Sequence, residues 1–227
     1  MKLITISNSK ILFEKAASIV ASEIDTLSKK EDIITLGLVG GRSVEKIYEI
    51  LAKKELLAWK KVHFFLVDER NVPNNNINSN YNLIYKHLIK KLLDRKQISK
   101  KNIHPINTKL SPNLAKREYA KELEKYKGYF DILIVSSGED NHIAAIFPEK
   151  KYPKDEKFTF FNDSPKPPKE RFTATPVLVS KTKICIVIFL GQEKKYALNH
   201  FLNKTNKKTL PERTLQKIKN LIILTNQ

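Results

Sequence analysis

The amino-acid sequence predicts an α/β protein with a single domain, in which a mostly parallel, Rossmann-like sheet is covered by helices on both faces. Segments with apolar residues at helical spacing alternate with short, almost continuously apolar segments. The short segments do not alternate apolar with polar residues, which is typical of strands buried on both faces of a parallel sheet. The chain has 227 residues and no internal repeat, so we expect one domain that spans residues 1–227 around one core.

Helical and extended patterns alternate from the start of the chain. Phe13, Val20 and Ile24 belong to an apolar stripe with helical spacing. Residues 33–39 form an apolar run that stops at a Gly-Gly pair, as expected of a buried strand. Two further helical stripes and a second apolar run follow. The expected elements are a helix over residues 9–28, a strand over 33–39, a helix over 44–51, a strand over 62–67 and a helix over 81–92.

The second half continues this pattern around one irregular segment. Apolar residues from Leu114 to Leu123 predict a helix, and the apolar run 130–135 predicts a strand that stops at Ser136. Residues 149–171 contain four prolines and many lysines, which predicts a long loop with the role of a lid as one option. The remaining expected elements are a strand near 173–178, a strand over 183–189, a helix over 193–202 and a strand over 221–224.

The net charge of the chain is +18, from 42 Lys and Arg residues against 24 Asp and Glu residues. Such an excess suits a protein that binds nucleic acid or another anion. Most of the cations are lysines spread along the chain, however, in pairs such as Lys53-Lys54, without an arginine-rich arm or an aromatic-interleaved patch. The pattern therefore disfavours nucleic acid as a partner. A bias in the composition of the source genome would explain the many lysines equally well.

The cysteine content and the apolar segments bear on the compartment. Cys185 is the only cysteine and lies in an apolar run, so we expect a buried thiol in a strand and no disulfide. The N-terminal sequence Met1-Lys2-Leu3-Ile4-Thr5-Ile6 is too short and turns polar too soon for a signal peptide, and no run of about 18 apolar residues occurs. These features predict a cytoplasmic protein without membrane contact.

Polar segments follow three of the expected strands. They are Gly40-Gly41-Arg42-Ser43, Asp68-Glu69-Arg70 and Gly138-Glu139-Asp140-Asn141-His142. Ligands of open parallel sheets bind beyond the carboxyl ends of the strands. We therefore expect all three segments to face one crevice.

The first two segments carry groups suited to an anion. Gly40-Gly41 precede an expected helix, whose N–H groups and dipole attract phosphate, and Arg42 and Ser43 add side-chain donors. The lysine of a P-loop is missing, and a simple tight turn is the alternative. Arg70 is a permanently charged donor for a phosphate or an oxyanion, with the carboxylate of Asp68 nearby. A surface ion-pair cluster is the alternative for this second segment.

His142 is the candidate catalytic base. Asp140 lies two residues before it, so a turn would let the carboxylate orient the imidazole or stabilise its protonated form. A structural histidine is the alternative. The other histidines lack a cluster of acidic or cysteine residues with the spacing of metal ligands, so we expect no metal site. They are His63, His87, His104 and His200.

Five segments occur in an order that is more specific than any one of them. They are Gly40-Gly41-Arg42-Ser43, Val67-Asp68-Glu69-Arg70-Asn71-Val72-Pro73, Ser79-Asn80-Tyr81-Asn82, Gly138-Glu139-Asp140-Asn141-His142-Ile143-Ala144-Ala145-Ile146-Phe147-Pro148 and Arg171-Phe172-Thr173-Ala174-Thr175-Pro176. In this order they resemble the motifs of the 6-phosphogluconolactonases, over most of the chain.

The resemblance implies hydrolysis of 6-phospho-D-glucono-1,5-lactone to 6-phosphogluconate in the oxidative pentose phosphate pathway, without a metal or organic cofactor. It implies that His142 activates water, that Asp140 orients His142, and that Arg70 or a neighbouring cation stabilises the oxyanion. The partner is then a small sugar phosphate, and the oligomeric state is left open. The residues expected to hold the phosphate are Gly40, Gly41, Arg42, Ser43, Arg171 and Lys194. An exposed helix lysine is the alternative for Lys194.

The chain departs from the family pattern at Asn141, where glycine is usual, at Ile143, where threonine is usual, and near Val44, where proline is usual. Asparagine tolerates positive φ, so Asn141 is expected to keep the turn, whereas Ile143 removes a hydroxyl near the site. Two alternatives remain. Glucosamine-6-phosphate deaminase shares the fold and the histidine, but typically has tyrosine in place of Arg70 and a catalytic glutamate near Ile146. The other alternative is a non-catalytic binder of sugar phosphates or polyanions.

Overall fold

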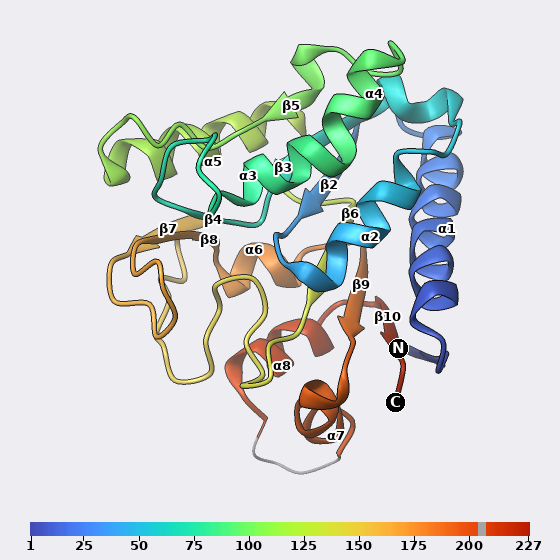
Figure 1. Ribbon diagram of the computed structural model, residues 1–227. Helices are drawn as coiled ribbons and strands as arrows, with labels where there is room; N and C mark the ends of the chain where they lie inside the picture. Colours follow the sequence, from blue (N-terminus) through green and yellow to red (C-terminus); the bar gives the residue numbers. More distant parts are fainter. Residues whose placement is uncertain (204–207) are drawn as a thin grey trace.

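The computed structural model describes residues 1–203 and 208–227 and contains two sheets (Figure 1). The larger sheet has seven strands in the order β1-β10-β9-β6-β2-β3-β5, and every neighbouring pair is parallel. Its strands are β1 (Lys2–Thr5), β2 (Ile34–Leu38), β3 (Val62–Leu66), β5 (Ile103–His104), β6 (Ile132–Ser136), β9 (Ile184–Phe189) and β10 (Asn220–Thr225). The smaller, antiparallel sheet has the order β4-β8-β7, with β4 (Asp68–Arg70), β7 (Phe158–Phe161) and β8 (Arg171–Ala174). The predicted mostly parallel α/β fold is confirmed.

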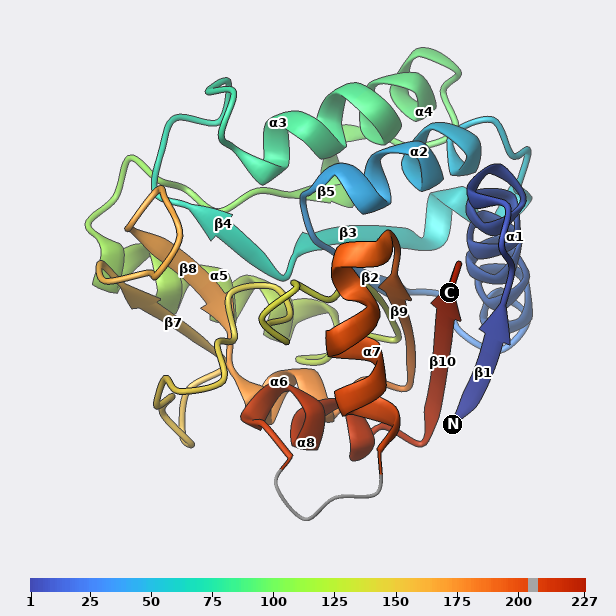
Figure 2. The same cartoon turned by 60° about the horizontal axis from the view of Figure 1, so that its bottom comes forward.

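Helices cover both faces of the larger sheet (Figure 2). One face carries α1 (Ser9–Ser28), α2 (Arg42–Leu51), α3 (Asn80–Ile84), the π-helical turn η2 (Tyr85–Ile89) and α4 (Lys90–Asp94). The other carries α5 (Pro112–Tyr126), α6 (Pro176–Ser180) and α8 (Leu210–Gln216), while α7 (Lys195–Leu202) follows β9. Short 3-10 turns are η1 (Leu57–Lys61), η3 (Lys100–Asn102) and η4 (Gln192–Lys194). Within the described residues, no helix is long and apolar enough to cross a membrane.

The first helix shows how sequence produces this packing. α1 begins after Asn8, whose side-chain oxygen accepts hydrogen bonds from the N–H groups of Lys10 and Ile11 at 3.0 and 3.1 Å. Its inner stripe, which includes Leu12 and Ile24, is fully buried. Burial of each such side chain contributes about 1.5–3 kcal/mol. The amphipathic pattern in the sequence therefore fixes which face of α1 lies on the sheet.

The predicted strand over residues 173–178 is wrong in its second half. β8 ends at Ala174, and α6 begins at Pro176. The hydroxyl of Thr175 accepts a hydrogen bond from the N–H of Leu178 at 3.4 Å, and Pro176 supplies a helical φ at the first position. These helix-start signals outweigh the apolar composition of the segment.

The small antiparallel sheet is the second difference from the prediction. Residues 149–171 were expected to be a loop but contain β7, and Asp68–Arg70, expected as a polar strand exit, form β4. β8 pairs with both of these strands. Strands of three or four residues carry too few positions for a local period, so their pairing with β8 is visible only in the folded chain. The edge strand β1 was also not predicted, because its four residues are likewise too few for a local period and it forms by pairing with β10.

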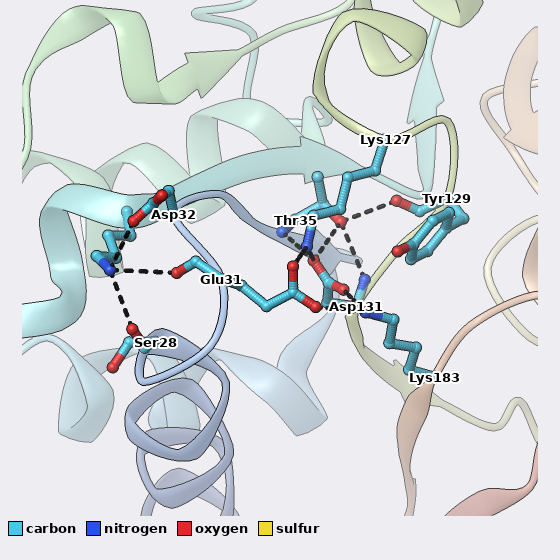
Figure 3. Close-up of polar contacts among 9 residues, drawn as sticks. Ser28, Glu31, Asp32, Thr35, Lys127, Tyr129, Asp131 and Lys183 are labelled. Atoms are coloured by element: carbon cyan, nitrogen blue, oxygen red, sulfur yellow. Dashed lines mark hydrogen bonds and ion pairs between the residues drawn. The ribbon is translucent and has the colours of Figure 1, made fainter.

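A polar network joins the amino ends of the adjacent strands β2, β6 and β9 (Figure 3). It therefore lies at the opposite end of these strands from the expected crevice. The fully buried carboxylate of Asp131 accepts a hydrogen bond from the N–H of Thr35 at 2.9 Å. Its two oxygens lie 2.9 Å from the ammonium groups of Lys127 and Lys183 respectively. Glu31 pairs with the same two lysines at 3.2 and 3.0 Å. A buried charge needs such partners, so this network holds the starts of three adjacent strands in place.

Candidate active site

A cavity of about 510 Å³ lies at the carboxyl ends of the parallel strands, as the sequence predicts for a ligand site. The segments that follow β2, β3 and β6 all contribute to its wall, together with the segment that follows β9. Of the predicted site residues, Asp140 is not on the wall but contacts His142. The predicted residues on the wall are Gly40, Gly41, Arg42, Ser43, Asp68, Arg70, His142, Arg171 and Lys194.

The imidazole of His142 is oriented by the neighbouring carboxylate. Its Nδ1 forms a hydrogen bond with Oδ1 of Asp140, and 20% of the His142 side chain remains exposed. An ionised carboxylate can only accept, so Nδ1 carries a hydrogen, and in the neutral imidazole Nε2 then keeps a lone pair. An oriented imidazole with an available lone pair is the arrangement of a general base.

Gly138 leaves the space that the His142 ring occupies. A Cβ at position 138 would lie 2.1 Å from Cε1 and Nδ1 of His142. The N–H of Gly138 donates to the carbonyl of His142 at 2.7 Å, and Asn141 adopts a φ of 64°. Asn141 thus keeps the left-handed turn, as expected from the sequence. The turn folds the imidazole back against Gly138.

Lys166 is a cavity residue that the sequence reasoning missed. Its ammonium group donates to Oδ1 of Asp140 at 3.2 Å and lies 3.9 Å from Glu139 Oε1. Burial raises the pKa of Asp140, but the hydrogen bond and charge of His142, with those of Lys166, outweigh burial and hold that pKa below its ordinary value. The surrounding prolines indicated only an irregular loop, and the spatial contact with Asp140 had no local signal.

The segment after β2 ends at the start of α2 with an open helix terminus. Gly41 has a φ of 117°, which favours glycine, and no described side chain caps the helix. The first N–H groups of a helix lack intrahelical partners and attract anions. A Cβ on Gly40 would lie 2.0 Å from Oδ1 of Asn80. Asn80 also donates to the carbonyl of Asp68 at 2.8 Å, so it ties two walls of the cavity together.

Glu69 is fully buried and anchors β4 to the start of α3. Its carboxylate accepts from the N–H groups of Arg70, Asn80 and Tyr81 at 2.6, 2.8 and 2.8 Å. The hydroxyl of Ser79 donates to it at 2.9 Å. Burial raises the pKa of Glu69, and these four hydrogen bonds counteract the rise. Glu69 therefore fixes the backbone of both Arg70 and Asn80.

Arg70 and Arg171 are paired residues of neighbouring antiparallel strands, and both line the cavity. Nε and Nη2 of Arg171 donate to the carbonyls of Pro168 and Pro167 at 2.9 and 3.0 Å. Burial, followed by the charge of Arg70, lowers the pKa of Arg171. Arg70 donates to the carbonyl of Asn78, while its buried Nε has no partner among the described residues. Arg171 thus holds the proline-containing loop, and Arg70 retains an unused donor.

Lys194 lies in a turn at the start of α7, as expected. Gly191 adopts a φ of 95°, and its N–H donates to Oδ1 of Asn226 at 2.9 Å. The N–H of Lys194 then closes the turn on the carbonyl of Gly191 at 2.8 Å. The C-terminal segment after β10 therefore positions the loop that carries Lys194.

The wall of the cavity carries more positive than negative charge. Two carboxylates, Asp68 and Glu193, line it. The cations on the wall are Arg42, Arg70, Lys166, Arg171 and Lys194. A concave site with an excess of one charge concentrates ligands of the opposite charge. The cavity therefore suits an anionic small molecule beside an oriented imidazole.

Ile143, one of the departures from the family pattern, belongs to the core. It is 1% exposed and its backbone bridges to Ser137 and Ile146, and its side chain is not on the wall of the cavity. The unusual residue therefore changes core packing next to His142 and leaves the wall of the cavity itself unchanged.

A cluster of potential metal ligands lies outside the cavity wall. Glu45 and Glu49 of α2 and His87 of η2 each offer one ligand atom within 4.8 Å of the others. Nδ1 of His87 lies 3.0 Å from Glu49, and Nε2 lies 3.5 Å from Glu45. Because both ring nitrogens face carboxylates, the geometry matches an imidazole bridging two acids. No local pattern predicts this cluster, because α2 and η2 are distant along the chain.

Comparisons with known proteins agree with the geometry. The family described as Glucosamine-6-phosphate isomerases/6-phosphogluconolactonase matches residues 7–223. A Borreliella burgdorferi protein named 6-phosphogluconolactonase is 36% identical over 201 residues, which cover 87% of this chain and 85% of the relative. A Thermotoga maritima protein of the same name is 31% identical, with 82% of each chain covered.

Solved structures show the same fold. A crystal structure of 6-phosphogluconolactonase from Thermotoga maritima superimposes with a TM-score of 0.87 at 27% identity, covering 99% of this chain and 98% of the other. The 6-phosphogluconolactonase from Trypanosoma cruzi, at 23% identity, shares the fold with a TM-score of 0.84 and coverage of 99% and 94%. From the match over nearly its whole length, this chain belongs to the glucosamine-6-phosphate isomerase/6-phosphogluconolactonase family.

Proposed function

We propose that the protein hydrolyses 6-phospho-D-glucono-1,5-lactone to 6-phospho-D-gluconate. The observation that carries the proposal is His142, oriented by Asp140 on the wall of a cavity with an excess of cations. The substrate combines an electrophilic ring carbonyl with a phosphate, and it therefore needs a base and an anion site in one cavity. Relatives named 6-phosphogluconolactonase support the same reaction.

The reaction begins with a water molecule between His142 and the lactone carbonyl carbon. As the water oxygen forms a bond with that carbon, Nε2 of His142 takes a proton from the water, and the carbonyl oxygen becomes an oxyanion. Asp140 stays ionised because its pKa is held low, and it stabilises the imidazolium that forms.

The oxyanion requires a preorganised cationic donor. Arg70 is the candidate, because it lies on the cavity wall and its guanidinium is permanently charged. Collapse of the oxyanion re-forms the carbonyl and breaks the bond between the carbon and the ring oxygen. His142 then returns its proton to the leaving ring oxygen, which completes the addition of one water molecule.

The phosphate of the substrate is assigned to other groups of the same wall. The start of α2 at Gly40-Gly41-Arg42-Ser43 offers backbone N–H groups, the positive end of a helix and a guanidinium. Lys194 and Arg171 add charge from two other segments. Phosphate held by groups on three segments would fix the distance between the lactone carbonyl and His142.

The test is an assay of purified protein on freshly prepared 6-phosphogluconolactone, with spontaneous hydrolysis subtracted. We expect enzymatic hydrolysis that His142→Ala lowers by at least about a hundredfold, while His87→Ala, a histidine outside the cavity wall, keeps the wild-type rate. A rate equal to the spontaneous one, or unchanged in His142→Ala, would contradict the proposal. Deamination of glucosamine 6-phosphate, measured in parallel, would instead identify the deaminase activity.

We further propose that the protein works in the cytoplasm, in the oxidative pentose phosphate pathway, with a sugar phosphate as its partner. The one cysteine, Cys185, is buried and unpaired, which fits a reducing compartment. Cell fractionation followed by detection of the protein would test the location.

A further inference from the structure

A second large cavity lies apart from the catalytic one. Its volume is about 650 Å³, within the range of small-molecule sites. The wall is formed by Asn74 and Asn75 of the segment 71–79, by residues of α3, η2 and α4, and by Lys100, Ile103 and Pro105. Its lining shares no residue with that of the catalytic cavity.

Two tyrosines give the second cavity an aromatic wall. The rings of Tyr81 and Tyr85 lie 5.8 Å apart, and each is only partly buried although each belongs to a helical segment. Leu93, Ile103 and Pro105 extend the apolar lining. Partly exposed aromatic rings in a concave site are suited to stacking with a flat aromatic ligand.

Lysines surround this aromatic wall. Lys86 and Lys100 are exposed and form no ion pair with any described residue, whereas Lys90 pairs with Asp94 at 2.7 Å. Two uncompensated ammonium groups next to aromatic rings would attract a ligand that is both aromatic and anionic.

The side-chain amides of Asn74 and Asn75 add hydrogen-bonding groups to the wall of the second cavity. Oδ1 of Asn74 is buried and has no partner among the described residues, and Asn75 lines the same cavity. An unpaired carboxamide oxygen needs a donor, and the amino group of adenine is the donor that Asn and Gln side chains pair with. Tyr85, moreover, begins a π-helical turn, a rare distortion that occurs often at functional sites.

We propose that this second cavity binds an adenine nucleotide. The base stacks on Tyr81 and Tyr85, its amino group lies at the edge lined by Asn74 and Asn75, and the phosphates contact Lys86 and Lys100. The inference does not depend on the proposed lactonase activity. The segment 71–79 also holds Arg70 through the carbonyl of Asn78, so the bound nucleotide would contact the segment that supports a catalytic residue.

The test is calorimetric titration of the whole protein with ADP. We expect one ADP per chain. Adenosine and pyrophosphate should each bind at least about tenfold more weakly, because adenosine lacks the phosphates and pyrophosphate lacks the base. Exchange of the base amino group for a carbonyl, in inosine diphosphate, should also weaken binding. Pyrophosphate that binds as tightly as ADP would overturn the proposal in favour of general polyanion attraction.

Matched variants locate the binding. Lys86→Ala/Lys100→Ala changes only exposed side chains, so the fold is retained, and we expect ADP affinity to fall at least about tenfold. Lys217→Ala/Lys219→Ala, also exposed, should bind like the wild type. Arg42→Ala/Lys194→Ala, in the catalytic cavity, should also leave ADP binding unchanged. If this last variant loses ADP, or if the first one does not, the nucleotide binds elsewhere and the proposal is wrong.

Discussion

Arg70 of β4 stands directly opposite Arg171 of β8, so two guanidinium groups from adjacent strands meet at the wall of the catalytic cavity. Like charges at opposed positions of a sheet are destabilising. The charges of Asp68 and Glu69 on the same strand as Arg70 offset part of this repulsion, and Arg171 donates hydrogen bonds to the carbonyls of Pro167 and Pro168. Arg171 therefore has a structural role besides its place on the cavity wall, whereas the Arg70 guanidinium donates, among the described residues, only to the carbonyl of Asn78.

Arg70→Gln should lower activity without lowering stability. Removal of the oxyanion donor is expected to reduce kcat by about 10²–10³, while the loss of repulsion with Arg171 keeps or raises the melting temperature. Steady-state kinetics and thermal unfolding would measure both effects. Arg117→Gln, an exposed arginine of α5, is the control that should change neither. A melting temperature that drops with Arg70→Gln would show that this arginine is structural.

Lys166→Met should impair catalysis through Asp140. The variant keeps the length of the side chain but removes the ammonium group that contacts Oδ1 of Asp140 at 3.2 Å. We expect kcat/KM to fall by about tenfold, the usual scale of one charge-assisted contact. Lys169→Met lies in the same loop and is exposed, so it should retain wild-type kinetics. Equal losses in the two variants would point to a general effect of loop charge.

Asp140 should contribute to stability in a pH-dependent way. Its folded pKa is below the ordinary value of 3.8 for an aspartate, so folding favours the ionised form. Its contribution is then fully present above about pH 4 and is lost as the pH falls through the lower folded pKa. Urea unfolding of wild type and Asp140→Asn at several pH values measures this difference. We expect the gap between the two proteins to narrow below pH 4, and a gap that widens there would reverse the assigned direction.

Gly138→Ala should displace the catalytic imidazole. The added Cβ would lie 2.1 Å from two ring atoms of His142, so the ring must leave its place beside Asp140. Activity should fall nearly as far as in His142→Ala, although one methyl group is the only change. A crystal structure of the variant would show the ring displaced, and full activity would mean that the turn can relax. Gly128→Ala, at a glycine away from the cavity wall, is the control: Gly128 has a positive φ that Gly138 lacks, so this variant should lose stability while it keeps wild-type activity.

The sequence predicted those parts of the site that lie next to strands with a strong periodic signal. Gly40-Gly41, Arg70 and His142 follow apolar runs. Parallel strands bring their carboxyl ends together regardless of the conformation of the connecting loops. Lys166 and Glu69 were not assigned roles, because their partners come from segments that no local pattern connects. The short strands β4 and β7 were missed for the same reason, since both form by pairing with β8.

Ile143→Thr tests whether the departure from the family pattern affects the reaction or only the core. Ile143 is 1% exposed and not on the wall of the cavity, so threonine would bury a hydroxyl among apolar neighbours. We expect a loss of about 1–3 kcal/mol in the free energy of unfolding, with no gain in kcat. Asn141→Gly is the companion variant, because glycine accepts the φ of 64° without strain. It should keep activity and change stability by less than about 1 kcal/mol. A large rise in kcat in Ile143→Thr would place that hydroxyl in the site after all, and would mark this chain as a slowed member of its family.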